Sequence, residues 1–204
     1  MLKDSKIKKD IQYSLVSGLM TGFIVWRLSI FLNIPEIFEI PYYWGIVIIP
    51  FVWFVGVNLG YFLGKYFKPF NQFGRFTAVG FTNAAVDFGI LNLLIALTGI
   101  AILPWYAVFK TVSFIGGLSN SYVFNKFWTF EAGESGGGSG EFAKFVGVVV
   151  FAWFVNVGTA SLVVYLIDPI GNLTPEAWAN VGAIVGAAFA LLLSFTGFKK
   201  VFNK

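Results

Sequence analysis

Charged side chains inside long apolar segments are the residues of this sequence best suited to chemistry. Asp87, Lys110 and Arg27 each lie within a run of residues that is otherwise fit for hydrocarbon. An unpaired charge in hydrocarbon is costly, so each of these residues is expected to have a partner or a function. Arg27 can extend to the outer headgroups or bind a phosphate. Asp87 and Lys110 can pair with each other or line a path for a polar molecule.

The expected depths of Asp87 and Lys110 favour an ion pair between them. At ~1.5 Å per residue, Asp87 lies about 18 Å along a helix from Arg75, and Lys110 lies about 24 Å from Lys126. Arg75 and Lys126 mark the same end of two adjacent segments, so the difference in depth is within the reach of a lysine side chain. An ion pair is the least costly way to hold both charges in lipid.

Polar and small residues share helical faces with these charges. Phe76, Gly80, Asn83 and Asp87 share one face of a helix by their spacing. A polar, small-residue stripe follows in the next segment, at Lys110, Ser113, Gly117, Asn120 and Ser121, and the comparable group in a third segment is Gly147, Asn156, Gly158 and Thr159. Such faces are typical of packing seams, where small residues permit close approach and amides hydrogen-bond across the contact. The alternative is that they line a polar path. Both interpretations stay open for Asp87 and Lys110, because an ion pair is an expensive way to pack two helices.

The composition predicts the elements that must position these residues. Of the 204 residues, 57% are hydrophobic and 12% are charged, whereas soluble domains average about 25% charged residues. Six apolar runs are long enough to cross a bilayer as helices, which takes about 20 residues each. We therefore predict an all-α integral membrane protein with six transmembrane helices. The runs are Ile11–Asn33, Tyr42–Phe67, Phe73–Ile102, Tyr106–Phe130, Phe142–Ile167 and Ala177–Phe198.

The distribution of basic residues predicts the orientation. All but two of the 14 lysines and arginines fall at one expected membrane face, and the opposite loops carry only acidic charges. The positive-inside rule then places both termini in the cytoplasm, as expected for a multi-pass protein of the cell membrane with an even number of spans. The net charge of +4 follows from this topology. It does not indicate nucleic-acid binding, because no basic soluble face is present to carry it.

Residues that the sequence lacks exclude several classes of chemistry. It has no Cys and no His, which excludes disulfides, thiolate chemistry and histidine-based catalysis or metal binding. It has neither a Gly-rich nucleotide-binding loop nor a second intramembrane carboxylate. We therefore expect neither an ATP-driven pump nor a glycosyltransferase, no enzymatic activity, and no cofactor or metal. The first apolar run is longer than that of a signal peptide and lacks a small-residue cleavage site, so we expect it to be retained.

Two copies of a helical hairpin follow one another, in residues 72–130 and 141–202. Their first segments begin with QFGRFTAVG and EFAKFVGVV, which aligns Arg75 with Lys144. Their second segments end with SYVFNKFWTF and SFTGFKKVF. Both copies start at the same membrane face, so the repeat is parallel.

The alignment of the two copies pairs further polar residues. The offset of the first segments places Asn156 opposite Asp87, and that of the second segments places Lys199 opposite Lys126. Between the copies lies the tract EAGESGGGSGE, residues 131–141. Its Gly/Ser composition predicts a flexible cytoplasmic spacer.

The pattern FGRFTAVGFTNAAVDFGILNLL, followed by Lys110 and GGLSNSYVFNKFWTF and by a second hairpin that ends SFTGFKKVF, resembles the GtrA-like family. This family includes the membrane domain fused to some dolichyl-phosphate mannose synthases, and the resemblance covers residues 72–202. It implies a four-helix bundle that moves or presents polyprenyl-phosphate-linked sugars, or that anchors the glycosyltransferase that makes or uses them. We therefore expect two parts. A two-helix hairpin, 1–70, lies outside the family core, and the family domain, 71–204, contains the flexible loop 131–141.

The resemblance also implies a site. The positions marked by the family's motif are Asn83, Asp87, Lys110, Asn125, Lys126 and Trp128. Together with Ser113, Asn120 and Asn156 they are predicted to bind the sugar lipid, and Arg75, Lys144, Lys199 and Lys200 to bind its phosphate at headgroup level. Each basic residue taken singly is also explained by the positive-inside rule. The sequence departs from the family at Phe127, which replaces a basic residue, and in the second hairpin, which lacks the Asn before its lysines. The first departure weakens the expected phosphate site of the first hairpin.

Two functions are consistent with these residues. The first is translocation of polyprenyl-phosphate-linked sugars for cell-surface polysaccharide or glycoconjugate synthesis. The alternative is a non-transporting scaffold that recruits a polyprenyl-phosphate glycosyltransferase. A solvent-accessible groove around Asp87 would favour transport, and a dry, packed ion pair would favour the scaffold. An exporter of small ions or metabolites is less consistent with a stripe rich in amides and poor in titratable groups. Expected partners are the sugar lipid, membrane lipids, and either a membrane glycosyltransferase or a second copy of the chain.

Overall fold

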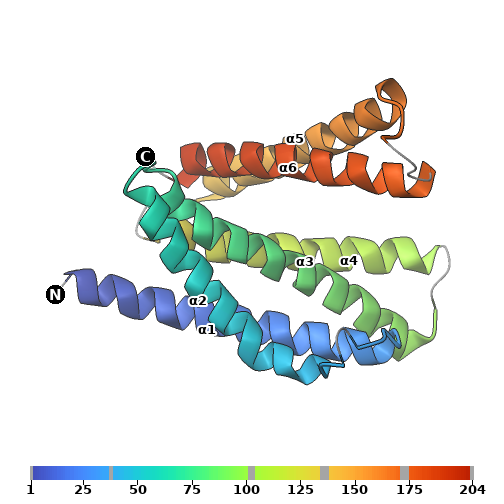
Figure 1. The fold of residues 1–204 in the computed structure, drawn as a ribbon, viewed down its shortest axis with the longest axis horizontal. Coiled ribbons are helices and arrows are strands. Elements are labelled where there is room, and N and C mark those ends of the chain that lie inside the picture. Colours follow the sequence, from blue (N-terminus) through green and yellow to red (C-terminus); the bar gives the residue numbers. More distant parts are fainter. Residues whose placement is uncertain (1, 37–38, 101–103, 134–137, 171–174, 203–204) are drawn as a thin grey trace. The chain divides into compact units, whose positions relative to one another are not determined.

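The structure of the chain is a computed structural model, and in the residues that it describes it confirms an all-α protein with six long helices (Figure 1). It describes residues 2–36, 39–100, 104–133, 138–170 and 175–202. The helices are α1 Leu2–Phe31, α2 Gly45–Gly64, α3 Phe70–Thr98, α4 Trp105–Phe124, α5 Ser139–Leu166 and α6 Pro175–Phe202. A short 3₁₀ helix, η1 Tyr42–Trp44, precedes α2, and a π-helical turn, η2 Asn125–Thr129, extends α4.

Proline and glycine set several of the helix ends. Pro69 and Pro104 directly precede α3 and α4, and Pro175 is the first residue of α6. Proline suits these positions because its fixed φ fits the helix start and its missing N–H has no intrahelical partner there. Gly99 ends α3 with φ of 71°, and its N–H bonds the carbonyl of Ile95 at 2.8 Å. A residue without Cβ adopts this left-handed conformation at little cost.

Length and apolar composition make this chain a multi-pass membrane protein. Within the described part of the chain, four helical segments are long and apolar enough to cross a membrane: Lys6–Phe31, Tyr42–Gly64, Phe70–Thr98 and Ser139–Asn156. Their large apolar side chains are extensively exposed, with Phe51 at 66% and Phe81 at 59%. An apolar outer surface of this kind is suited to lipid. Crossing by α4 and α6, and the cytoplasmic location of both termini, stay predictions.

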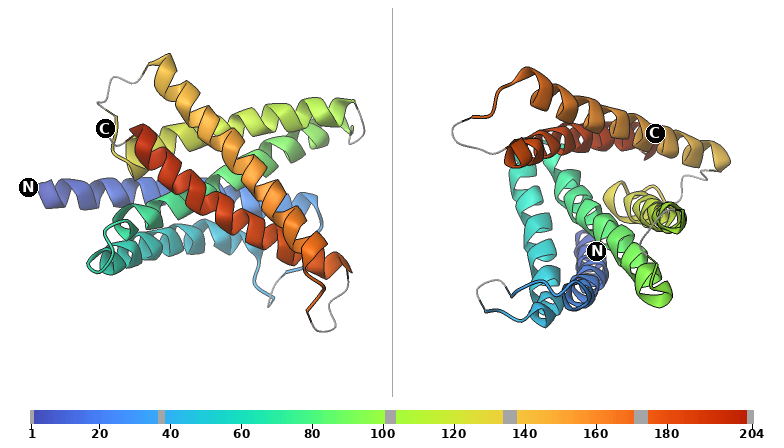
Figure 2. Two further views of the ribbon diagram at one scale, coloured as in Figure 1. Left: turned by 90° about the horizontal axis from the view of Figure 1, so that it is seen from above. Right: turned by 90° about the vertical axis from the view of Figure 1, so that its right-hand side faces the viewer.

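The chain divides into two compact units. Unit 1 is Met1–Glu131 and unit 2 is Ala132–Lys204. In unit 1, α2 packs against α1 and α3, and α3 also packs against α1 and α4. In unit 2, α5 and α6 form an antiparallel pair and lie side by side in both views of Figure 2. The family domain that the sequence predicts over 71–204, separate from the hairpin 1–70, stays a prediction.

Glycines allow the helices of unit 1 to approach one another closely. A Cβ added at Gly22 of α1 would lie 2.5 Å from the carbonyl oxygen of Gly45 on α2. At Gly74 of α3 a Cβ would lie 2.8 Å from the carbonyl oxygen of Gly56. These atoms belong to backbone and cannot move aside as a flexible side chain would. Small residues at such crossings increase the packing contact that holds membrane helices together.

Candidate functional site

Four of the predicted site residues meet between α3 and α4, and we call them the polar stripe: Asn83, Asp87, Ser113 and Asn120. Asn120 Nδ2 donates a hydrogen bond of 2.6 Å to Asn83 Oδ1. Ser113 Oγ donates a hydrogen bond of 2.6 Å to Asp87 Oδ1. Gly117 lies between Ser113 and Asn120 on α4, and a Cβ there would lie 3.2 Å from the Asn83 carbonyl oxygen. The glycine therefore brings the two helices close enough for the polar side chains to bond directly.

The polar stripe is only partly covered. Ser113 is fully buried, whereas Asn83, Asp87 and Asn120 are half-buried. The amide and carboxylate groups are therefore bonded to each other and partly accessible at the same time. Lys110 lies on α4, but its side chain is outside the described part of the structure. Its expected ion pair with Asp87 stays a prediction.

Three other predicted site residues belong to the π-helical turn η2 and pack inside unit 1. Trp128 is fully buried, stacks on Tyr13 with ring centroids 5.6 Å apart, and donates from Nε1 to Asp10 Oδ1 at 3.0 Å. Lys126 is buried, and its Nζ lies 3.3 Å from the hydroxyl of Tyr122. The expected contact of these side chains with substrate stays a prediction.

Asn125, the first residue of η2, is held by the last turn of α4. Its Nδ2 donates to the backbone oxygen of Ser121 at 2.9 Å, while its buried Oδ1 accepts no hydrogen bond in the described part of the structure. A π-helical turn places an extra residue in a helix and is often found near functional sites. In this chain the turn directs the indole of Trp128 toward Asp10 on α1 and the carbonyl oxygen of Trp128 toward Arg75 on α3.

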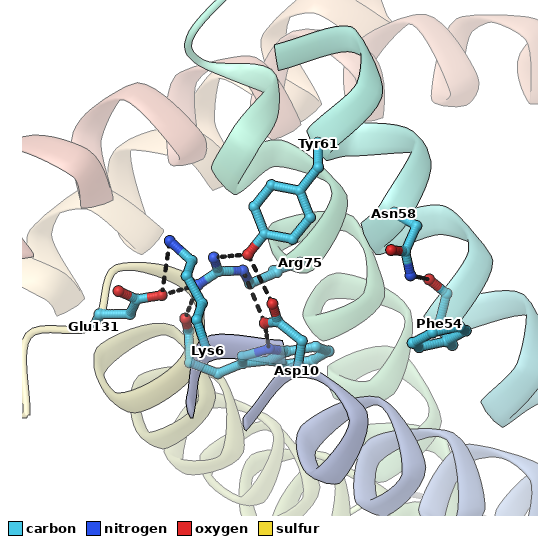
Figure 3. Close-up of polar contacts among 8 residues, drawn as sticks. Lys6, Asp10, Phe54, Asn58, Tyr61, Arg75 and Glu131 are labelled. Atoms are coloured by element: carbon cyan, nitrogen blue, oxygen red, sulfur yellow. Dashed lines mark hydrogen bonds and ion pairs between the residues drawn. The ribbon is translucent and has the colours of Figure 1, made fainter. Parts of the chain in front are cut away.

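A polar cluster surrounds Arg75 near the start of α3, and Figure 3 shows Asp10, Tyr61 and Glu131 around its guanidinium. With Trp128, whose carbonyl oxygen and indole N–H also bond within it, we call this set the Arg75 cluster. The Arg75 side chain is 2% exposed, and its Nε lies 3.2 Å from Asp10 Oδ1. Its Nη1 donates to the Trp128 carbonyl oxygen at 2.8 Å and to Glu131 Oε1 at 2.5 Å, and its Nη2 donates to the Tyr61 hydroxyl. Tyr61 in turn donates to Asp10 Oδ2 at 2.7 Å. The helices α1, α2 and α3, the turn η2 and the residue Glu131 thus contribute to one polar network around the buried Arg75.

Glu131 closes the Arg75 cluster at the solvent side. Its backbone has φ of 54°, which is uncommon for a residue with a side chain, and Lys6 Nζ lies 3.4 Å from its carboxylate. Partial burial raises the pKa of Glu131, but the hydrogen bond and charge of Arg75, together with the charge of Lys6, outweigh it and hold the pKa below its usual value. Glu131 therefore stays ionised when Arg75 is bound to it.

The structure gives Arg75 protein partners rather than the exposed position expected for a phosphate ligand. Asp10, Tyr61 and Glu131 were not among the predicted site residues. A signal for two of them was present in the sequence, because Asp10 directly precedes the first apolar run and Glu131 directly follows the fourth. Both carboxylates therefore fall at the same expected membrane face as Arg75, where opposite charges can pair.

Two of the predicted phosphate ligands line a groove between α5 and α6 in unit 2. This α5–α6 groove has a volume of about 520 Å³ and is lined by Lys144, Gly147, Val148, Phe151, Leu193, Thr196, Gly197, Lys200 and Val201. Lys144 and Lys200 are exposed, one near the start of α5 and the other in the last turn of α6. Lys199 and Asn156 are half-buried and are not among the lining residues.

Aromatic packing and a close helix contact fix the shape of this groove. Phe145 of α5 is fully buried and stacks on Phe198 of α6, with ring centroids 4.6 Å apart. Farther along, a Cβ at Gly197 would lie 2.6 Å from Val148 Cγ1. These contacts bring the helices together beside the two lysines, so that cationic and apolar side chains share one surface.

Comparison with known proteins identifies relatives of this chain. The family model described as "GtrA/DPMS, transmembrane domain" matches residues 75–202. A protein of Bacillus subtilis (strain 168), described as "Uncharacterized membrane protein YngA", is 33% identical over 115 residues, which cover 52% of this chain and 74% of that protein. No solved structure matches the chain.

Proposed function

Because the chain belongs to the GtrA/DPMS transmembrane-domain family, we propose that it translocates polyprenyl-phosphate-linked sugars across the membrane, for cell-surface polysaccharide or glycoconjugate synthesis. The observation that carries this proposal is the polar stripe between α3 and α4. Asn83, Asp87 and Asn120 are partly accessible and lie on helices in which most residues are apolar. The proposed translocation needs no cofactor. The protein is proposed to lie in the cell membrane with both termini on the cytoplasmic side.

A sugar that leaves water for the membrane loses its hydrogen bonds to water, and the side chains of the polar stripe can replace them. A polar group transferred to hydrocarbon without new hydrogen bonds costs several kcal/mol, about 2–7 per group. An asparagine side chain supplies both a donor and an acceptor, and the Asp87 carboxylate accepts from more than one hydroxyl. When sugar hydroxyls replace the Asn83–Asn120 and Ser113–Asp87 bonds, each bond that is broken is exchanged for another. The prenyl chain stays in the surrounding lipid throughout.

A second candidate is a scaffold that recruits a polyprenyl-phosphate glycosyltransferase. The observation that favours it is the mutual pairing of the same side chains, at 2.6 Å in both bonds. Pairs that already satisfy one another are also suited to holding two helices together. In that case the partner enzyme would bind the sugar lipid, and this chain would position the enzyme.

Translocation in proteoliposomes separates the two candidates. Purified protein is reconstituted with a polyprenyl-phosphate hexose, and movement of the hexose to the other leaflet is followed by its accessibility to a membrane-impermeant reagent. The test variant is Asn83→Ala combined with Asn120→Ala, and the control is Asn92→Ala. Asn92 lies on α3 and bonds the backbone oxygen of Phe88 on its own helix at 2.9 Å.

We expect protein-dependent movement by the wild type and by Asn92→Ala. The double variant lacks the hydrogen bond that each of the two asparagines would make to the sugar. At about 1 kcal/mol for each bond, its translocation should be about 30-fold slower. No movement by folded wild-type protein would support the scaffold, and unchanged movement by the double variant would place the path elsewhere in the chain.

A further inference from the structure

The aligned basic residues of the two hairpin copies differ in their exposure: Arg75 of the first copy is buried, and Lys144 of the second is exposed. In the first copy Arg75 is 1% exposed and is bound by two carboxylates, those of Asp10 and Glu131. In the second copy the aligned Lys144 is exposed and lines the α5–α6 groove. An anion that approaches the first copy meets a guanidinium already neutralised by the protein. The second copy therefore has the more accessible cation.

The α5–α6 groove has a cationic end and an apolar floor. Because α5 and α6 are antiparallel, Lys144 near the start of one and Lys200 near the end of the other lie at the same end of the pair. Phe151 and Leu193 each lie seven residues farther along their helices, or about 10 Å at ~1.5 Å per residue. The lining contains no acidic residue, and the one hydroxyl is that of Thr196. The volume of about 520 Å³ falls in the range of known ligand sites, about 300–1,000 Å³.

We propose that the α5–α6 groove binds the phosphate end of a polyprenyl-phosphate lipid. Lys144 and Lys200 contact the phosphate, and the first isoprene units lie along Val148, Phe151 and Leu193. The sugar-free polyprenyl monophosphate used as the probe carries about −1.5 to −2 charges at neutral pH, which two ammonium groups match, whereas a polyprenyl-phosphate hexose is a phosphodiester with a single negative charge that the same two groups can also bind. The inference rests on the proposed function for its class of ligand. It adds that only the second hairpin copy holds the phosphate, because Asp10 and Glu131 occupy the corresponding cation of the first.

Photo-crosslinking in proteoliposomes tests the site directly. The probe is a polyprenyl monophosphate that carries a photoactivatable group in its first isoprene units, and labelled peptides are identified by mass spectrometry. Unlabelled polyprenyl monophosphate, the neutral polyprenol of the same length, and phosphatidylglycerol serve as competitors. We expect labelling of peptides that contain Val148, Phe151 or Leu193, and competition by the monophosphate alone.

Charge removal is tested with a matched pair of double variants. Lys144→Gln with Lys200→Gln removes both groove cations, whereas Lys65→Gln with Lys68→Gln removes two exposed lysines of unit 1 from the same expected membrane face. A lysine near a membrane surface strengthens binding of an anionic lipid by about fivefold, so the groove variant should bind the probe about 20- to 30-fold more weakly. The control variant should bind it as the wild type does.

A second test blocks the volume of the α5–α6 groove while leaving the charges of Lys144 and Lys200 in place. Gly147 lines the groove and a Cβ there has no neighbour within 4 Å, so Gly147→Trp is designed to place a large side chain at the groove from an open position on the backbone. Gly158 on the same helix has equally open surroundings and does not line the groove, which makes Gly158→Trp the control. We expect Gly147→Trp to abolish labelling of the groove peptides and Gly158→Trp to leave it unchanged.

The outcomes separate this proposal from the proposed function. Labelling confined to other peptides, labelling that survives both groove variants, or equal competition by phosphatidylglycerol would overturn the phosphate site. Wild-type translocation that persists in such a case would leave the proposed function standing. Groove labelling that both variants remove, in a protein that moves no lipid, would support the phosphate site and contradict translocation.

Discussion

Replacing Asp10 with Asn tests whether the Arg75 cluster holds unit 1 together. Asp10 is 5% exposed and Arg75 is 1% exposed, so the charge of Arg75 would lose its most buried counter-charge. The Asn oxygen can still accept the hydrogen bond of Trp128 Nε1, so the variant removes charge with little change of shape. Breaking a buried ion pair by removing one partner costs about 3–5 kcal/mol. Because Arg75 keeps Glu131 and the Trp128 carbonyl, we expect the lower end, about 3 kcal/mol.

The free energy of unfolding is measured by titration with a denaturing detergent, followed by circular dichroism and tryptophan fluorescence. A cycle adds Arg75→Gln and the double variant Asp10→Asn/Arg75→Gln, and the coupling between the two sites should be about 1–3 kcal/mol. Glu36→Gln, which changes an exposed acid in the same way, is the control and should stay within about 0.5 kcal/mol of the wild type. Additive single effects, or an Asp10→Asn protein as stable as the control, would refute the reasoning.

Two further predictions concern the same unit. Gly74→Ala should destabilise the protein, because its Cβ would lie 2.8 Å from the Gly56 carbonyl oxygen. Gly56→Ala has open surroundings and should be tolerated or slightly stabilising in the same detergent titration. Equal effects of the two substitutions would contradict the close helix contact. The lowered pKa of Glu131 means that its contribution to stability is complete above the usual glutamate pKa of about 4.3 and is lost as pH falls through the lower folded value. The difference in melting temperature between wild type and Glu131→Gln should therefore shrink from about pH 7 to about pH 3, and a difference that stays constant with pH would speak against the ion pair with Arg75.

The sequence predicts the fold class and the number of helices because both follow from local physics. Apolar runs of membrane-crossing length, interrupted by prolines such as Pro69, Pro104 and Pro175, specify six helices with little help from tertiary contacts. Helical spacing also brings Asn83 and Asp87 onto one face of α3, and the structure pairs that face with Asn120 and Ser113 of α4. A periodic pattern on two adjacent helices therefore indicates that polar side chains meet between them, but it does not identify Ser113, in addition to the expected Lys110, as a partner of Asp87.

The environment of Arg75 could not be predicted in the same way. The positive-inside rule places a basic residue at the cytoplasmic face but says nothing of whether it faces water or protein. Its partners Asp10, Tyr61 and Glu131 come from positions far apart in the chain, and only tertiary packing brings them together. The environment of Trp128 could not be predicted either. Its packing against Tyr13 and its hydrogen bond to Asp10 involve α1, a helix outside the matched family segment.

The measurement that tests the central claim most directly is transbilayer movement of a polyprenyl-phosphate hexose in liposomes. Wild-type protein is compared with protein-free liposomes and with the folded Asn83→Ala/Asn120→Ala variant. The account predicts movement that requires the protein and slows about 30-fold in the variant, for the two hydrogen bonds of about 1 kcal/mol that it loses. Movement in wild-type liposomes no faster than in protein-free ones, with the protein folded and fully inserted, would contradict it.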